Sequence, residues 1–284
     1  MLTLLLTSSL AVGTPRIVVA SGFDREFDMA EIKINESMGV ADRIIFGESP
    51  VSQTGHPRVL RLSRLKRHHP AIEVYSYECN SKEQRDWKLG WGCEGVPREG
   101  VRRDACNGED DSTVVVLSDA DEIVSGSTLM RLKQNPPPSG IIISFKRTMS
   151  VHLYGFFWQK IGESYSTATA FTCKTERNKE KKRPSVVQFP FNSGWHCSYC
   201  FPVDEYLGKM HNMLKGDGWL SLSDHYWSLE TLYAFRQNGI PLNQKKKMSP
   251  SVVDPPLYAQ TMPYLVHNTN LTLHEHPTHP FVFP

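Results

Sequence analysis

The chain has 284 residues, a length that fits one large domain or two small ones. Its composition, with 39% hydrophobic, 22% charged and 10% aromatic residues, excludes a disordered chain, a collagen and a coiled coil. The 32 basic and 30 acidic residues leave a formal net charge of +2, which excludes the global positive field typical of nucleic-acid-binding proteins. The six cysteines are compatible with disulfides, metal ligation or buried thiols.

The first residues, MLTLLLTSSLAVG, form an apolar run that is shorter than the ~20 residues needed to span a bilayer. The run has the length of the apolar part of a signal peptide, but no basic residue precedes it. We therefore expect residues 1–15 to be a leader, the remnant of a signal anchor or the edge of a fragment. Glycosylation triplets at Asn35 and Asn270 give weak support for a secretory route.

Short apolar runs alternate with helical patterns along the chain. Strands are expected at 16–21, 43–46, 113–117, 141–145 and 152–158, and helices at 26–39, 60–70, within 79–112 and at 125–134. This alternation favours an α/β fold with a mostly parallel central sheet flanked by helices. Residues 174–184 are expected to form a charged, exposed loop. One domain over 16–245 is then followed by a Pro/His-rich extension, 246–284, that packs on the domain or trails from it.

The strongest strand pattern, TVVVL at 113–117, runs directly into the acidic cluster Asp119-Ala120-Asp121-Glu122. Open α/β sheets bind their ligands at the carboxyl ends of the strands. Three carboxylates within four residues repel one another, and a hard divalent cation or solvent neutralises them best. A strand ending in Asp-x-Asp is also the arrangement with which nucleotide-sugar transferases hold a metal–diphosphate. The alternative is an acidic turn that leads into a helix N-cap.

A second motif, GWHCSYCF at 194–201, combines aromatic residues with a histidine and a Cys-x-x-Cys pair. Such a pair beside a histidine can bind zinc, but the other four cysteines form no second pair of this spacing, which argues against a structural zinc site. A disulfide within the pair, or from the pair to another cysteine, is the better expectation in an oxidising compartment. The rings of Trp195, Tyr199 and Phe201 can stack on a sugar face or fill a core.

Taken together, these motifs resemble glycosyltransferase family 17. The segments that carry the likeness are 26–36 (EFDMAEIKINE), 42–49 with 54–57, 114–123 (VVVLSDADEI), 154–158 (YGFFW) and 194–201, with a weaker echo at 263–268. They follow the order and spacing of the family, and their combination is more specific than any one of them. The chain departs from the family at Val124, where a proline is usual, and at 209–217, which lack a later His and Glu.

The resemblance implies a GT-A-like nucleotide-sugar-binding fold and a hexosyltransferase of the β-1,4-N-acetylglucosaminyltransferase type. Such an enzyme moves GlcNAc from UDP-GlcNAc to a mannose of an N-glycan, in the bisecting position and with inversion, using Mn²⁺ or Mg²⁺. We expect Asp121 to ligate the metal and Asp119 to hold metal, ribose or uracil. Glu48, which follows another expected strand, is either a donor contact or a surface carboxylate.

Inversion needs a general base that takes the proton from the acceptor hydroxyl. The candidates for this base are Glu122, Asp204, Glu205 and Asp217. The residues expected to contact the sugar or the acceptor are Trp158, Trp195, His196 and Tyr199.

The resemblance also implies a place in the secretory pathway, in the Golgi lumen, as a type II membrane protein or a truncated or secreted form. In that compartment a disulfide between Cys197 and Cys200 is expected. The expected partners are UDP-GlcNAc and an N-glycan or glycoprotein, with no nucleic acid and with membrane contact only through an N-terminal anchor. The alternative in another function class is a catalytically weak, lectin-like or scaffold protein that retains the fold.

Overall fold

The structure is a computed structural model of the whole chain, and it describes residues 14–24, 26–51, 57–79, 93, 95–145, 150–153, 156–158, 168–189 and 193–196. In chain order the elements are β1 (Ile17–Gly22), α1 (Phe27–Ser37), β2 (Arg43–Glu48), α2 (Leu62–His68), β3 (Glu73–Ser76), α4 (Gly95–Asp104), β4 (Val114–Asp119), β5 (Glu122–Val124), α5 (Gly126–Gln134), β6 (Ile141–Phe145), β7 (Ser150–Leu153), β8 (Phe156–Trp158), β9 (Thr169–Thr172), α6 (Cys173–Asn178), β10 (Ser185–Phe189) and β11 (Gly194–His196).

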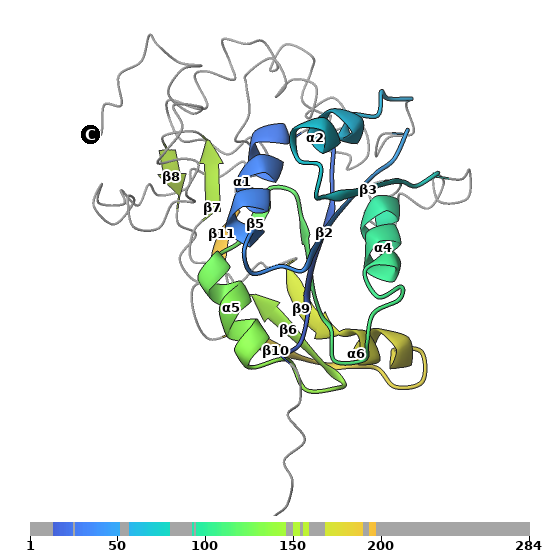
Figure 1. Cartoon of the computed structure of the whole chain (residues 1–284), viewed down its shortest axis with the longest axis vertical. Coiled ribbons are helices and arrows are strands. Elements are labelled where there is room, and N and C mark those ends of the chain that lie inside the picture. The colour runs from blue at the N-terminus through green and yellow to red at the C-terminus, as the bar shows by residue number, and fades with distance from the viewer. Residues whose placement is uncertain are drawn as a thin grey trace, which may run out of the picture.

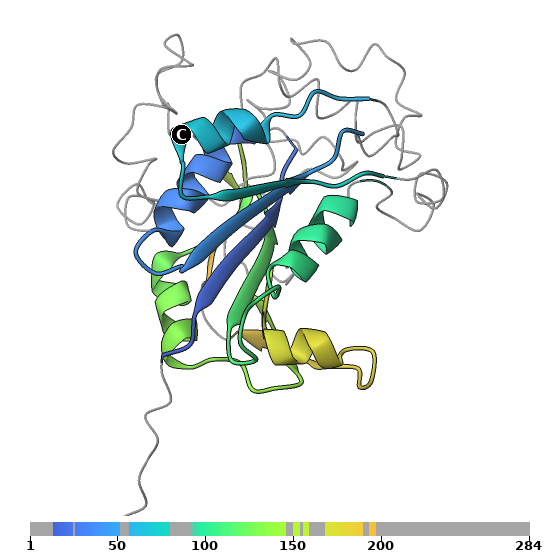
Figure 2. The same ribbon diagram turned by 45° about the vertical axis from the view of Figure 1, so that its right-hand side comes forward.

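The larger sheet has seven strands in the order β10-β6-β9-β4-β1-β2-β3. Neighbouring strands are parallel except around β9, which runs antiparallel to both β4 and β6. Helices α1 and α5 lie on one side of this sheet, and α4 and α6 lie on the other (Figure 1; Figure 2 gives a second view). The expected α/β class, with a mostly parallel central sheet flanked by helices, is confirmed.

The two central strands, β1 and β4, are buried on both faces. Ile17 and Val19 of β1 pack with Leu129 of α5, whereas Val18 and Ala20 pack with Val101 of α4. Burial on both faces explains why these strands read as continuous apolar runs rather than as alternating patterns. Each fully buried aliphatic side chain contributes ~1.5–3 kcal/mol relative to exposure, so these strands anchor the fold.

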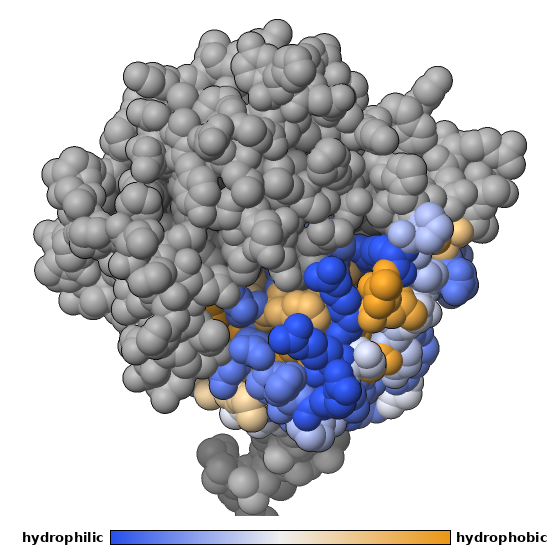
Figure 3. All heavy atoms as spheres, turned by 90° about the horizontal axis from the view of Figure 1, so that it is seen from above, coloured by the Kyte–Doolittle hydropathy of each residue, from blue (hydrophilic) through white to orange (hydrophobic). Residues whose placement is uncertain are grey.

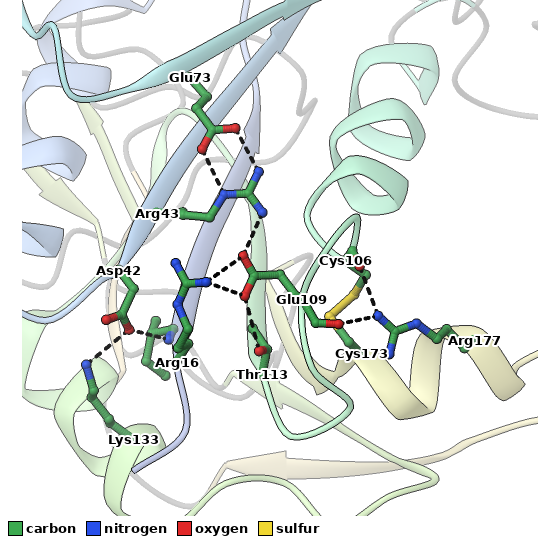
Figure 4. Close-up of polar contacts among 11 residues, drawn as sticks. Arg16, Asp42, Arg43, Glu73, Cys106, Glu109, Thr113, Lys133, Cys173 and Arg177 are labelled. Carbon is green, nitrogen blue, oxygen red and sulfur yellow. Dashed lines mark hydrogen bonds and ion pairs between the residues drawn. A yellow bond between two sulfur atoms is a disulfide. The ribbon is translucent and has the colours of Figure 1, made fainter. Parts of the chain in front are cut away.

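An ion-pair network and a disulfide fasten the amino ends of the strands (Figure 4). Arg43 donates hydrogen bonds to both Glu73 and Glu109, and Arg16 also pairs with Glu109. The Cys106–Cys173 disulfide joins the segment after α4 to the start of α6, with a sequence separation of 67. Ion pairs and a disulfide therefore stabilise the end of the sheet at which these strands begin. The acidic motif lies at the opposite, carboxyl end.

The described surface carries its large exposed hydrophobic residues mostly at separate places. They are Met38, Val59, Leu60, Tyr75, Met130, Val186 and Val187. Seen from above in Figure 3, the described part is mainly hydrophilic, with hydrophobic groups in small clusters. Scattered exposure of this kind is normal for a folded protein, and the main apolar content lies in the core.

Three expectations from the sequence differ from the structure. Residues 152–158 contain the end of β7 and all of β8, which pair antiparallel, so the single aromatic strand was wrong. Residues 174–184 are helical at their start, because the Thr172 side chain accepts a hydrogen bond from the Thr175 backbone and caps α6. Strands β3, β5, β9, β10 and β11 were not anticipated.

No helix within the described ranges is long and apolar enough to cross a membrane. The expected boundary at residue 245 and the extension 246–284 lie outside the described residues, as does most of the expected leader, 1–15.

Candidate functional site

The acidic turn, residues 119–122, joins β4 to β5 at the carboxyl end of the larger sheet. Asp119 is the last residue of β4 and lies in register with Gly22, the last residue of β1. The backbone N–H of Ala120 donates to the Gly22 carbonyl at 3.1 Å, and the backbone N–H of Asp119 donates to the Glu122 carboxylate at 3.1 Å. The turn is thus closed on itself and fastened to β1.

The three carboxylates of the turn differ in exposure. The Asp119 side chain is 40% exposed, whereas Asp121 and Glu122 are 7% and 3% exposed. Desolvation, followed by repulsion from Glu122, raises the pKa of the Asp119 carboxyl above its ordinary value, and the nearby Arg98 opposes this rise. The cluster is therefore a concentrated negative site at which Asp119 is the most accessible group.

Two cations flank the acidic turn. Arg98, in the first turns of α4, places Nη1 2.5 Å from Oδ1 of Asp119. Lys33 of α1 lies beneath the turn, 1% exposed, and donates to Ser21 Oγ at 2.7 Å, to Ser118 Oγ at 2.8 Å and to the Asp119 carbonyl. Burial lowers the pKa of Lys33 to about 8, while the carboxylates of the turn favour its charged form.

The carboxylate oxygens of the turn suit a hard divalent cation that takes only some of its ligands from the protein and the rest from a substrate. Within the described ranges, no three His, Cys, Asp or Glu side chains converge on one point as a metal site. Mg²⁺ and similar ions commonly bind through one or two carboxylates and take their other ligands from substrate phosphates and water. Asp119 and Asp121 suit this arrangement, since both are oxygen donors at the carboxyl end of the sheet.

The second, four-stranded sheet brings the acidic turn and the aromatic motif together. Its order is β5-β11-β7-β8, and β11 pairs antiparallel with β5 so that Glu122 opposes His196 and Ile123 opposes Trp195. His196 is in turn the register partner of Ser150, and Ser150 is the partner of Trp158. Glu122, His196, Ser150 and Trp158 are therefore successive register partners across the four strands of this sheet.

Glu48 is buried at 4% exposure, which contradicts the expectation of a surface carboxylate. Its two carboxylate oxygens accept the backbone N–H groups of Arg61 at 2.7 Å and Leu62 at 2.8 Å, at the start of α2. Burial raises the pKa of Glu48, and these two hydrogen bonds oppose the rise. The side chain thus caps α2; the other expectation, donor binding by Glu48, stays a prediction.

The acidic cluster is not a helix N-cap either. Ser125 caps α5 instead, accepting the Thr128 backbone N–H, and β5 separates this cap from the acidic turn. The alternative reading is therefore right that residues 119–122 form an acidic turn and wrong that this turn leads directly into a helix N-cap.

The remaining expected site residues lie outside the described ranges: Cys197, Tyr199, Cys200, Asp204, Glu205 and Asp217. The other four cysteines pair as Cys79–Cys93 and Cys106–Cys173. These two disulfides contradict a bond from Cys197 or Cys200 to one of the other four cysteines, and the expected Cys197–Cys200 disulfide lies outside the described residues.

Sequence reasoning missed both cations. Arg98 falls in a charged stretch and carries no distinguishing pattern. Lys33 does have a signal, because it lies four residues after Met29 and four before Ser37, and all three belong to the buried face of α1. A lysine within the apolar stripe of a helix predicts a buried partner.

Comparisons with known proteins agree with these features. The sequence model described as glycosyltransferase family 17 matches residues 9–223. Two curated relatives, from Homo sapiens and Rattus norvegicus, share the name beta-1,4-mannosyl-glycoprotein 4-beta-N-acetylglucosaminyltransferase. Each is 26% identical over 241 residues, covering 71% of this chain and 44% or 43% of the relative, so the chain spans less than half the length of these relatives.

A solved structure, the apo-form glycosyltransferase GlyE of Streptococcus pneumoniae TIGR4, also matches. The match covers 59% of this chain and 36% of that one, at 12% identity and a TM-score of 0.30.

Proposed function

Because the chain belongs to glycosyltransferase family 17, we propose that it transfers N-acetylglucosamine from UDP-GlcNAc to a mannose of an N-linked glycan, in the bisecting β-1,4 position and with inversion. The observation that carries the proposal is the acidic turn at the carboxyl end of the sheet, paired through β5 with the Gly194–His196 strand. The names of the curated relatives supply the sugar and the glycoprotein acceptor.

In this proposal the acidic turn binds the donor diphosphate. Asp121 and Asp119 are the residues that would hold a divalent cation, Mn²⁺ or Mg²⁺. When bound, the cation supplies Lewis-acid stabilisation of the negative charge that develops on the UDP leaving group. Arg98 keeps the Asp119 carboxylate in place before the donor arrives, since the two side chains are 2.5 Å apart.

The second sheet supplies the acceptor side of the proposed site. Trp195 and His196 lie on β11, next to β5, the strand that continues from the acidic turn, and Trp158 lies on β8, at the far edge of the same sheet. Aromatic rings and hydrogen-bonding side chains are a common pairing in carbohydrate sites. Tyr199 follows in the same motif. A general base takes the proton of the attacking mannose hydroxyl, and Glu122 is the one candidate base within the described ranges.

We also propose that the protein works in the lumen of the secretory pathway, in the Golgi. Two disulfides, Cys79–Cys93 and Cys106–Cys173, support this location, because disulfides persist in oxidising compartments.

Product analysis tests the proposed reaction. The purified chain is incubated with an N-glycan acceptor, Mn²⁺ and each of a panel of UDP-sugars, and the glycan is then analysed by mass spectrometry and NMR. We expect a gain of one N-acetylhexosamine from UDP-GlcNAc and a β-anomeric proton in the product. Glycan binding without release of UDP from any donor would favour the lectin-like alternative.

A further inference from the structure

Lys33 is a buried lysine that joins three elements at one point below the acidic turn. It is carried by α1, and its ammonium reaches Ser21 on β1 and Ser118 on β4. These two serines are cross-strand partners, one position before the pair Gly22–Asp119 that ends the two strands. The ammonium therefore spans the central strand pair where the acidic turn begins.

The hydrogen bonds of Lys33 account for its whole donor capacity. A lysine ammonium has three N–H donors and no acceptor. Two of the donors go to the hydroxyl oxygens of Ser21 and Ser118 at 2.7 and 2.8 Å, and the third goes to the Asp119 backbone carbonyl. A lysine is almost never fully buried without such partners. The position of the ammonium is thus defined by the ends of β1 and β4.

The charge of Lys33 needs an explanation beyond packing. A neutral side chain of similar volume could fill the space between α1 and the two strands without the desolvation penalty of an ammonium. The compensating charges are the carboxylates of Asp119, Asp121 and Glu122, all of which act on Lys33. Arg98, the other cation, binds the Asp119 carboxylate from the surface and is 22% exposed, whereas Lys33 is enclosed.

Resting on the proposed function, we propose that Lys33 is a positioning residue for the transfer reaction. Its hydrogen bond to the Asp119 carbonyl fixes the turn that carries Asp119 and Asp121. Its positive charge offsets part of the repulsion among the three carboxylates while no cation or donor is bound. Lys33 acts through these residues and does not contact the substrate.

Lys33→Met tests the proposal, because it keeps an unbranched side chain only one atom shorter and removes the charge and the donors. Without the positive charge the turn attracts a dication more strongly, so direct calorimetric titration in the presence of UDP should give an apparent Mn²⁺ affinity about threefold or more tighter than wild type. Without the fixed geometry, kcat for UDP release should fall by about tenfold or more.

Lys133→Met is the matched control. Lys133 also pairs with a carboxylate, that of Asp42, but near the amino end of β1, where the Asp42 carboxylate accepts the backbone N–H of Ile17. We expect this variant to keep the wild-type Mn²⁺ affinity and kcat.

If Lys33 has only a structural role, the two measurements on Lys33→Met give a different result. In that case kcat of Lys33→Met falls only in proportion to the folded fraction, measured by circular dichroism, and the Mn²⁺ affinity equals that of wild type; this result would overturn the proposal. If Lys33→Met does not fold, the double variant Ser21→Ala, Ser118→Ala replaces it. That variant keeps the charge and removes two acceptors, and the proposal requires a fall in kcat of more than twofold at unchanged Mn²⁺ affinity.

The same titrations separate the two proposals. A wild-type protein that binds Mn²⁺ with UDP but transfers no sugar contradicts the proposed function, while the affinity of Lys33→Met still tests the role of the lysine. A wild-type protein that binds no Mn²⁺ contradicts both.

Discussion

Glu122 of β5 and His196 of β11 are direct partners in an antiparallel strand pair, although they come from motifs far apart in the sequence. This pairing connects the acidic turn of the larger sheet to the aromatic motif of the smaller one. Two of the segments that carry the likeness to glycosyltransferases, 114–123 and 194–201, therefore meet in the structure at this strand pair.

Gly194 controls this strand pairing. A Cβ atom at Gly194 would lie 1.8 Å from the Ile123 carbonyl oxygen, a backbone atom that cannot move aside without shifting β5. We expect Gly194→Ala to separate β11 from β5 and to lower the transfer rate by about tenfold or more, since a displacement of 1 Å can cost up to 100-fold. The larger sheet should stay intact in circular dichroism. A variant with the full wild-type rate would show that the β5–β11 pairing is dispensable.

Variants of Glu48 distinguish a structural role of this side chain from a substrate-binding role. Since both oxygens cap α2, Glu48→Ala should lower the free energy of unfolding by about 1–2 kcal/mol, and Glu48→Gln, which retains one acceptor oxygen, should lower it less. If the role of Glu48 is structural alone, the KM for UDP-GlcNAc stays within twofold of wild type in both variants. Urea denaturation and donor kinetics measure the two effects. A large rise in KM for Glu48→Gln at unchanged stability would instead identify a donor contact.

The Cys106–Cys173 disulfide should be the more stabilising of the two described disulfides. Its sequence separation is 67, against 14 for Cys79–Cys93, and the entropy removed from the unfolded chain grows with the size of the closed loop. Replacing both cysteines by serine should cost about 4 kcal/mol for the longer loop and about 3 kcal/mol for the shorter one. Chemical denaturation of both double variants gives the comparison, and the reverse order would show that loop entropy does not govern the effect.

The Arg43–Glu73 contact gives an acid-dependent contribution to stability. The hydrogen bond from Arg43 lowers the pKa of Glu73 below its ordinary value of 4.5, while partial burial opposes the shift. A carboxyl whose pKa is lower in the folded state stabilises the fold above its unfolded pKa, and this contribution is lost as the pH falls through the folded pKa. The Tm of wild type should therefore fall below about pH 5 more steeply than that of Glu73→Gln. Parallel Tm curves would rule out this linkage.

Local sequence patterns predicted the strands that consist of apolar residues throughout. The runs that became β1 and β4 are apolar throughout, because helices cover both faces of these strands. Strand β10 was missed, since it lies at the edge of the sheet with Val186 and Val187 exposed at 66% and 50%, and its pairing with β6 is not encoded locally.

The acidic residues of the candidate site were predicted from the sequence, but the strand pairing that joins them to the aromatic motif was not. Asp119, Asp121 and Glu122 were found because they directly follow a strand whose carboxyl end lies at the binding edge of the sheet. The register that links Glu122 through His196 to Trp158 depends on pairing between distant strands, which a single sequence does not reveal. For Lys33 the helix pattern signals burial, but its partners on β1 and β4 are not revealed by the sequence.

UDP release by wild type and Asp121→Asn, measured side by side with UDP-GlcNAc, Mn²⁺ and an N-glycan acceptor, tests the central claim most directly. Asp121 belongs to the acidic turn, and loss of its charge should remove several kcal/mol of leaving-group stabilisation, which corresponds to a rate at least ~100-fold lower at an unchanged Tm. Asp111→Asn is the matched control, since Asp111 is 61% exposed and pairs with Arg177 away from the turn; it should keep the wild-type rate. Equal rates of UDP release in wild type and Asp121→Asn would contradict the assignment of the acidic turn as the donor site.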